Sequence, residues 1–197
     1  MESFVLMVAL ALAFAFDSKP SIMRQMFPGI LWISFLFAGT LGIGKAFRQE
    51  EADDTLTGIF LAPGDRWAVF AAKTAVAYIF MVSTEILTVP IFFILWHEPW
   101  NARMGLWMSV LLLGALGLVE VATLLAAMTV SIKNPEITLS FLLIPLEIPV
   151  LIMAVQATAD IVSPKVSHIG LWIHGLIAYD AIFLALPLMI SSYLWEV

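Results

Sequence analysis

The sequence predicts an all-α protein, a polytopic membrane helix bundle with about six transmembrane spans. Apolar residues make up 62% of the 197-residue chain and charged residues 12%, whereas soluble domains carry roughly 25% charged residues. The apolar residues form long runs separated by short polar segments. Tryptophans, which favour the membrane–water interface, lie at or near the ends of these runs: Trp32, Trp67, Trp96, Trp100, Trp107, Trp172 and Trp195. We expect residues 1–197 to form a single transmembrane domain.

Composition and motif content exclude several classes of function. The net charge of −6 argues against nucleic acid as a partner. The chain has no cysteine, which excludes disulfides, thiolate catalysis and iron–sulfur ligation. No nucleophile–base constellation appears in the sequence. We therefore predict a non-catalytic membrane subunit with no metal and no firmly bound cofactor.

The first expected span, Phe4 to Phe16, is short. Its 13 apolar residues would cover about 20 Å of the ~30 Å hydrocarbon core. A signal peptide is the alternative, because Ala13 and Ala15 form an A-x-A pattern. The preceding segment contains Glu2 and no Lys or Arg, which is unlike a signal peptide. We predict a short or truncated first span.

Five further spans follow along the chain. The second is uncharged, and its Ala38 and Gly42 offer a small-residue face for close helix packing. The third, fourth and sixth are long enough to require tilting or kinking. The predicted ranges are Met26 to Gly44, Trp67 to Trp96, Met104 to Ile132, Ile137 to Ala159, and Ile169 to Trp195.

The fifth span contains two prolines, Pro145 and Pro149, in the sequence LIPLEIPVLI. Each proline removes one backbone hydrogen bond, so the helix is expected to kink or unwind there. In a transporter such a kink could act as a hinge, and in a static bundle it is merely tolerated. We predict a hinge at this pair.

The longest polar stretch is Phe47 to Pro63, between the second and third spans. Read as a helix, it places Leu56, Ile59 and Phe60 on one face and acidic residues on another. It is either a solvated linker or the attachment point of a soluble partner, and we favour the attachment point. The four acids lie within five residues: Glu50, Glu51, Asp53 and Asp54.

Four acidic residues lie inside apolar spans: Glu85, Glu120, Glu147 and Asp180. An ionised group at mid-membrane costs at least about 2.5–3.5 kcal/mol, so such residues usually face a cavity or a partner. One hypothesis is a proton or cation relay, which would make the chain a stand-alone proton-coupled secondary transporter. The other is a set of protonated or hydrogen-bonded carboxyls facing the bundle interior. No Lys or Arg lies in the centre of any span to pair with them.

The segment GTLGIGKA, Gly39 to Ala46, nearly matches a phosphate-binding loop. Its last position is Ala46, which lacks the hydroxyl that binds magnesium, and the segment lies within a span. We therefore expect that this chain does not itself hydrolyse ATP.

Three features together resemble one family. The first is PGILWISFLFAGTLGIGKAF (Pro28 to Phe47), which runs into RQEEADDTL and then IFLAP. The second is LLIPLEIPVLIMA (Leu142 to Ala154). The third is the order of six spans, with a single acidic loop after the second. From Pro28 to its C-terminus the chain is similar to the haem exporter protein B family (CcmB).

This resemblance implies a six-span permease of the ABC-2 type in the cytoplasmic (inner) membrane, with both termini cytoplasmic. The acidic loop, about residues 46–66, would be a coupling helix that sits in a cleft of an ABC ATPase subunit. The coupling residues would be Arg48, Glu50, Glu51, Asp53, Asp54 and Leu56. A basic-rimmed groove would suit this acidic, apolar-backed helix.

The resemblance also implies partners: a second copy in a homodimer, two ATPase subunits and a haem-handling membrane subunit. The lipid bilayer surrounds the membrane subunits. Haem would be the transported or handled ligand in cytochrome c biogenesis. Members of the family usually begin with a basic amphipathic segment before a full-length first span. This chain begins with Met1-Glu2 and 13 apolar residues. We expect either a start further upstream or a smaller ATPase-facing surface.

Overall fold

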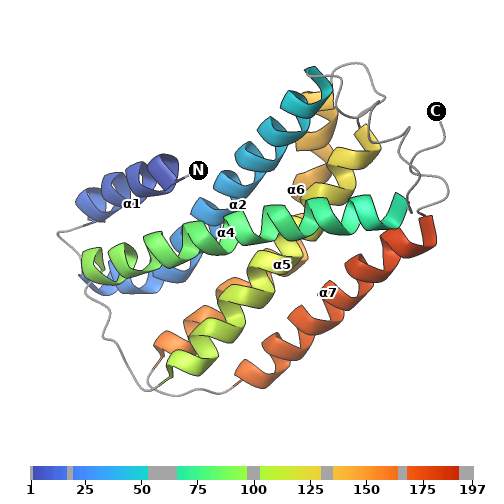
Figure 1. The fold of residues 1–197 in the computed structure, drawn as a ribbon. Helices are drawn as coiled ribbons and strands as arrows, with labels where there is room; N and C mark the ends of the chain where they lie inside the picture. Colours follow the sequence, from blue (N-terminus) through green and yellow to red (C-terminus); the bar gives the residue numbers. More distant parts are fainter. Residues whose placement is uncertain are drawn as a thin grey trace.

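The computed structural model describes residues 2–16, 20–52, 66–96, 103–129, 135–163 and 168–190. Within these ranges the chain is helical and contains no strand. Five helices contain an apolar segment long enough to cross a membrane, and the apolar part of the first helix, Val5–Ala15, is shorter. These findings confirm the all-α membrane bundle with a short first element. The helices are α1 (Glu2–Phe16), α2 (Pro20–Ala52), α4 (Arg66–Leu95), α5 (Met104–Thr129), α6 (Pro135–Val162) and α7 (Ile169–Ile190) (Figure 1).

The helix that contains the second span is longer than the sequence predicts. Its apolar part, Arg24–Ile43, matches the expected span, but α2 begins at Pro20 and does not end at Gly44. The residues after Gly44 read KAFRQEEA and are mostly strong helix formers. The acidic helix expected as a separate element therefore begins as a continuation of α2.

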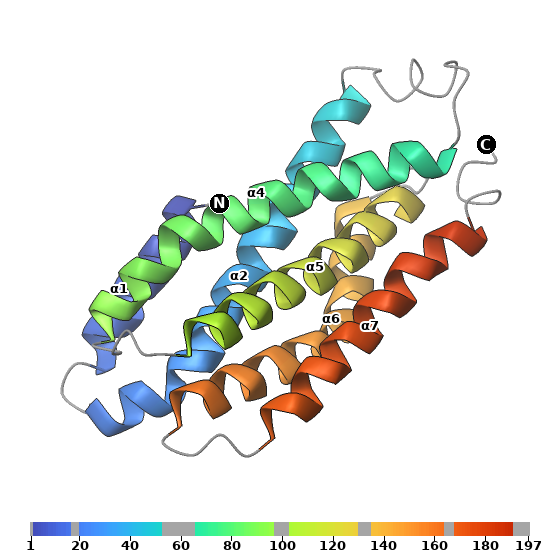
Figure 2. The ribbon, with the colours of Figure 1, turned by 60° about the horizontal axis from the view of Figure 1, so that its bottom comes forward.

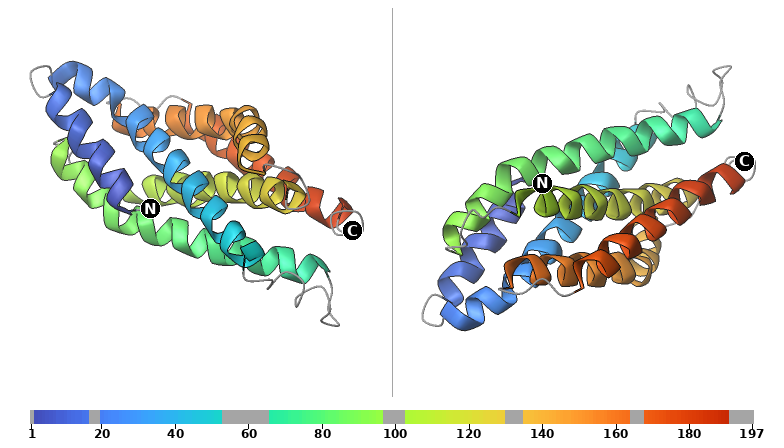
Figure 3. Two further views of the ribbon diagram at one scale, coloured as in Figure 1. Left: turned by 90° about the horizontal axis from the view of Figure 1, so that it is seen from above. Right: turned by 90° about the horizontal axis from the view of Figure 1, so that it is seen from below.

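Helix α5 is the centre of the bundle. It packs against α2, α4, α6 and α7, and Figure 3 shows it between the α2–α4 side and the α6–α7 side. Its sequence is mostly apolar and has no extended polar face, which is typical of a helix packed on several sides. Small residues such as Gly114, Gly117 and Ala115 allow neighbouring helices to approach closely.

Trp32 does not belong to an interfacial belt, contrary to the sequence prediction. Its side chain is fully buried, and its indole N–H donates a hydrogen bond of 2.8 Å to Thr158 Oγ1 on α6. The ring lies so close to Gly114 of α5 that a Cβ at this position would overlap it. Trp32 therefore joins α2, α5 and α6, and Gly114 makes room for it.

An aromatic cluster joins α2, α4 and α5 at the end of the bundle where α4 ends and α5 begins. The Phe92 and Trp96 rings stack with centroids 5.1 Å apart, and the Phe93 and Trp107 centroids lie 5.0 Å apart. Phe27 of α2 packs edge-on against Phe93 and Trp107. Such pairs contribute about 0.5–1.5 kcal/mol each beyond their buried area. Trp96 and Trp107 are thus buried members of this cluster.

The proline pair does not unwind α6, which is helical from Pro135 to Val162 with both prolines inside it. Of the two outcomes expected there, a kink or unwinding, unwinding does not occur. Figure 2 shows that the two halves of α6 run in different directions. Between the prolines, the Leu146 carbonyl accepts a hydrogen bond of 2.7 Å from the Tyr179 hydroxyl of α7. This bond ties the proline segment to α7, and hinge motion there stays a prediction.

Candidate functional site

The predicted coupling segment begins on the last turns of α2. Arg48, Glu50 and Glu51 belong to this helix, whereas Asp53, Asp54 and Leu56 lie outside the described residues. From Ile43, where the apolar span ends, the helix continues to Ala52, a distance of about 13 Å at 1.5 Å per residue. An unbroken helix transmits a displacement of its end directly into the span.

Several helix termini gather at the same end of the bundle as this segment. Figures 1 and 2 place the end of α2, the start of α4 and the end of α7 there, together with the end of α5 and the start of α6. A soluble partner bound to the segment would therefore face the ends of most of the membrane helices.

The four intramembrane acids lie on four different helices and are all buried. Glu85 is on α4, Glu120 on α5, Glu147 on α6 and Asp180 on α7, with exposed fractions of 3%, 0%, 1% and 3%. Each therefore points into the protein and away from lipid, as expected for polar groups at this depth.

The structure brings three of these acids together around Tyr179. The Tyr179 hydroxyl is close enough to interact electrostatically with Glu147, Asp180 and Glu120, and Glu120 also interacts with Asp180. The missing side chain of Gly117 makes this possible, because a Cβ there would lie 2.9 Å from Asp180 Oδ1. Helix packing thus assembles groups that are far apart in the sequence.

Most carboxyl oxygens of this cluster have no hydrogen-bond partner among the described residues. These buried atoms are both oxygens of Glu120, both of Asp180 and Oε2 of Glu147. Within the described ranges, no three acidic or histidine side chains are arranged to hold a metal ion. The chemistry that suits such a cluster is the binding of a proton or of a hydrogen-bond donor.

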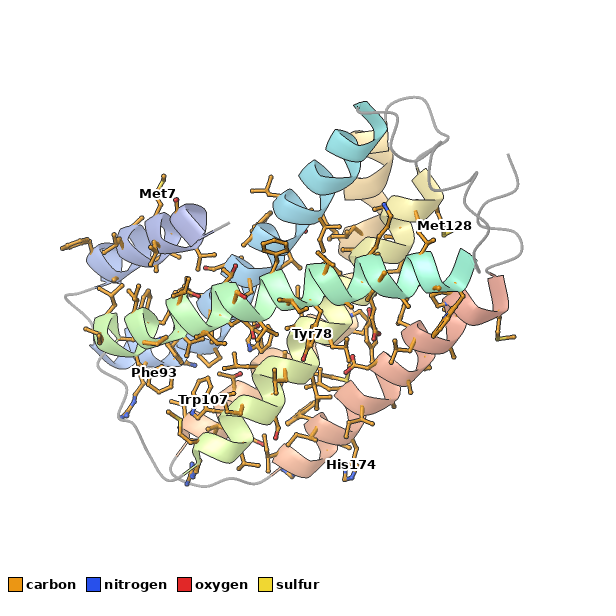
Figure 4. All side chains as sticks on the ribbon, in the orientation of Figure 1. Met7, Tyr78, Phe93, Trp107, Met128 and His174 are labelled. Atoms are coloured by element: carbon orange, nitrogen blue, oxygen red, sulfur yellow. The ribbon has the colours of Figure 1, made fainter. Side chains whose placement is uncertain are left out.

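Glu85 lies apart from Tyr179, in a groove between α4 and α5. The groove has a volume of about 190 Å³ and is otherwise lined by apolar side chains. Tyr78, one of the labelled residues in Figure 4, interacts electrostatically with Glu85, Asp180 and Glu120 and donates a hydrogen bond of 3.1 Å to the Leu112 carbonyl. The sequence did not indicate a role for either tyrosine or the presence of the groove, because both depend on how the helices pack.

Comparison with known proteins gives the family. The family model described as CcmB protein matches residues 2–191. The chain belongs to the CcmB protein family. This confirms the resemblance and extends it, because the match includes α1 and the start of α2, ahead of Pro28.

Several curated relatives of this CcmB-family chain are named "Heme exporter protein B". The protein from Rhodobacter capsulatus is 32% identical over 155 residues, covering 78% of this chain and 70% of the relative. The protein from Pseudomonas aeruginosa is 29% identical over 178 residues, covering 89% of this chain and 78% of the relative. The protein from Paracoccus denitrificans is 29% identical over 155 residues, covering 79% and 71%.

The unpartnered state of Glu120 in this CcmB-family chain leads to a stability prediction. Glu120→Met removes a buried carboxyl without a partner and keeps the length of the side chain. We expect the variant to be more stable in detergent by about 1–3 kcal/mol, the cost of an unsatisfied buried group. Thermal unfolding followed by tryptophan fluorescence measures this. Glu120→Ala is the control. It should be less stable than Glu120→Met, because the shorter side chain leaves a cavity. A Met variant less stable than the parent would mean that the carboxyl makes a stabilising interaction.

Proposed function

We propose that this chain is the transmembrane subunit of an ABC-type complex that exports or delivers haem for cytochrome c biogenesis. The subunit is non-catalytic, and a separate ATPase chain hydrolyses ATP. Membership of the CcmB family and relatives named "Heme exporter protein B" support the haem-export role. The observation that carries the ATPase partnership is the extension of α2 beyond its span into the acidic segment.

In this function the acidic segment docks in a cleft of the ATPase. The contact would be formed by Arg48, Glu50, Glu51, Asp53, Asp54 and Leu56, with the acidic residues facing a basic rim. Closure of the ATPase dimer displaces the end of α2, and the rigid helix carries this displacement into the bundle. Trp32 passes it on, because it contacts Gly114 of α5 and Thr158 of α6. The bend at Pro145 and Pro149 lets α6 respond as a hinge.

The proposal assigns the acidic end of the bundle to the cytoplasm. The end of α7 lies at this same end (Figure 1), so the C-terminus is cytoplasmic, and the N-terminus is assigned to the same side. The complex contains two copies of this chain, two ATPase subunits and a haem-handling membrane subunit in the inner membrane. Haem is its transported or handled ligand.

Purification of the tagged protein from its native membrane in a mild detergent tests this function. Mass spectrometry of the co-purifying chains should identify a P-loop ATPase together with a second membrane subunit. Recovery of the folded protein without either chain would contradict the ABC assignment.

A second candidate function is stand-alone, proton-coupled transport. It is favoured by the gathering of Glu120, Glu147 and Asp180 around Tyr179, with carboxyl oxygens that have no partner. This function requires transport by the purified chain in vesicles without any ATPase. It also requires a pH dependence that disappears in Glu120→Gln or Asp180→Asn. Transport that depends on ATP and the partner ATPase would reject it.

A further inference from the structure

The groove between α4 and α5 opens on the outer surface of the bundle. It is bordered by exposed apolar side chains, among them Ile86 at 63% exposure and Met108 at 51%. Phe93 and Trp107, which Figure 4 labels near the end of the bundle, form part of its wall. Their rings pack against each other with centroids 5.0 Å apart, so this wall is rigid.

A single carboxyl group lines the groove. Glu85 is only 3% exposed, and its Oε1 atom is buried without a hydrogen-bond partner. The hydroxyl of Tyr78, the nearest phenol, is already committed to the Leu112 carbonyl. Thr84 and Thr88 beside Glu85 donate to the carbonyls of Phe80 and Thr84 in their own helix. Among the described residues, these three hydroxyls are therefore not available to Glu85 Oε1, and a donor from another chain would satisfy it.

We propose that the groove between α4 and α5 receives a transmembrane helix of a second, different membrane subunit, whose hydrogen-bond donor side chain inserts into the groove and binds Glu85. A lysine, arginine, asparagine or glutamine would serve as this donor. The proposal rests on the proposed function, because it requires the complex to contain such a subunit.

The size of the groove fits an inserted side chain. Its volume of about 190 Å³ lies below the roughly 300–1,000 Å³ of sites that enclose drug-sized ligands. It is comparable with the roughly 150 Å³ cavity that holds one benzene molecule. One long side chain fills such a space, whereas a porphyrin does not fit inside it.

The depth of Glu85 argues against a lipid as the occupant. Glu85 lies about 15 Å along α4 from its end at Leu95, at 1.5 Å per residue. Lipid head groups, which carry the donors, stay outside the hydrocarbon core, and acyl chains have no donor. An apolar groove with a buried acceptor at this depth is complementary to a polar residue of a helix.

The depth of Glu85 also argues against a second copy of this chain as the occupant of the groove. In a two-fold pair within a membrane the axis is normal to the bilayer, so equivalent residues keep their depth. The exposed amide or imidazole donors of the described spans are Gln25 on α2, Gln156 on α6 and His174 on α7. They lie about 8 Å, about 9 Å and about 8 Å from the nearest ends of their helices, at Pro20, Val162 and Ile169. All three are shallower than Glu85.

The lining of the groove suits contact with a different chain. Met104 and Met108 lie along one side, and methionine side chains adapt their shape to a partner. The packed rings of Phe93 on α4 and Trp107 on α5 hold the spacing of the two helices. The adaptable methionines and the rigid aromatic wall together allow a side chain of another subunit to be enclosed after it inserts.

Photo-crosslinking in the intact complex tests the proposal. A benzoylphenylalanine replaces Met108 in the groove, and in a matched control it replaces Leu184 on α7, which is similarly exposed at 47%. The Met108 probe should crosslink to the membrane subunit that co-purifies with the complex. The captured peptide should lie in a transmembrane helix, within two turns of a polar donor. The Leu184 probe should give at most a tenth of that yield.

Two variants then test the role of the groove. Glu85→Leu removes the acceptor, and Ile86→Trp fills the space from an exposed position that folding tolerates. Each should lower the Met108 crosslink at least tenfold while ATPase recovery stays unchanged. Glu85→Gln, which keeps an acceptor, should fall between Glu85→Leu and the parent.

Several results would overturn the proposal. Crosslinking of Met108 to lipid alone or to a second copy would do so, and so would a subunit crosslink that both variants leave intact. Recovery of neither an ATPase nor a second membrane subunit would reject the proposed function, and this inference with it. Recovery of both without a groove-dependent crosslink would reject this inference alone.

Discussion

Reversal of both charges in Glu50→Lys/Asp53→Lys is expected to abolish recovery of the ATPase and reduce the yield of c-type cytochrome to background. The two positions lie in the acidic stretch that starts on the last turns of α2. Like charges placed against each other in an interface cost several kcal/mol. A loss of about 3 kcal/mol or more weakens binding at least roughly a hundredfold. Co-purification with the tagged protein and haem staining of membrane fractions measure the two effects.

The control for this variant is Glu136→Lys. Glu136 lies in the first turn of α6, at the same end of the bundle as the acidic segment (Figure 1). It is outside the proposed contact, so we expect ATPase recovery within twofold of the parent. An equal loss of ATPase recovery in Glu136→Lys and in the double variant would indicate a general effect of charge at this end of the bundle. Undiminished ATPase recovery and cytochrome yield in the double variant would reject the coupling role of the segment.

Gly114→Ala is expected to destabilise the bundle, whereas the same substitution at Gly29 is not. The new Cβ would overlap the Trp32 ring, and the ring cannot move without losing its hydrogen bond to Thr158. Overpacking and the lost bond together cost about 2–4 kcal/mol, which exceeds the ~1 kcal/mol that alanine gains over glycine in a helix. We expect a lower unfolding temperature in detergent and a lower level of the protein in membranes.

Gly29→Ala provides the matched control, because Gly29 lies inside α2 and no atom would lie within 4 Å of its new Cβ. This variant should be as stable as the parent or more stable by up to about 1 kcal/mol. Trp32→Phe combined with Gly114→Ala should recover part of the lost stability, since the smaller ring leaves room for the methyl group. Equal stability of the two alanine variants would mean that Trp32 moves freely, which contradicts its role as the link between α2, α5 and α6.

The sequence alone determined the fold class, the number and order of the long spans, and the family. Apolar runs are local properties, and a run of about 20 residues must form a helix that crosses the bilayer, because no other backbone conformation satisfies its polar groups there. The starts of α4, α5 and α7 and the end of α4 were therefore predicted to within one residue. The family was predicted from continuous stretches such as PGILWISFLFAGTLGIGKAF, which can be recognised without knowing the fold.

Boundaries were less predictable where two local signals competed. Gly44 and the charges after it indicated the end of a membrane span, and the span does end at Ile43. The helix nevertheless continues to Ala52, since leaving the bilayer does not interrupt backbone hydrogen bonds in a run of strong helix formers.

Only the tertiary structure decided how the helices meet. Trp32 resembled an interfacial tryptophan in the sequence, and its burial depends on Gly114, which lies on another helix. The four intramembrane acids were evident from the sequence, but it did not indicate that three of them surround Tyr179 while Glu85 lines a separate groove. In a bilayer every apolar face can be exposed to lipid at little cost, so hydropathy does not specify which faces pack together. Small residues, buried hydrogen bonds and aromatic contacts make that choice, and they act between residues distant in the chain.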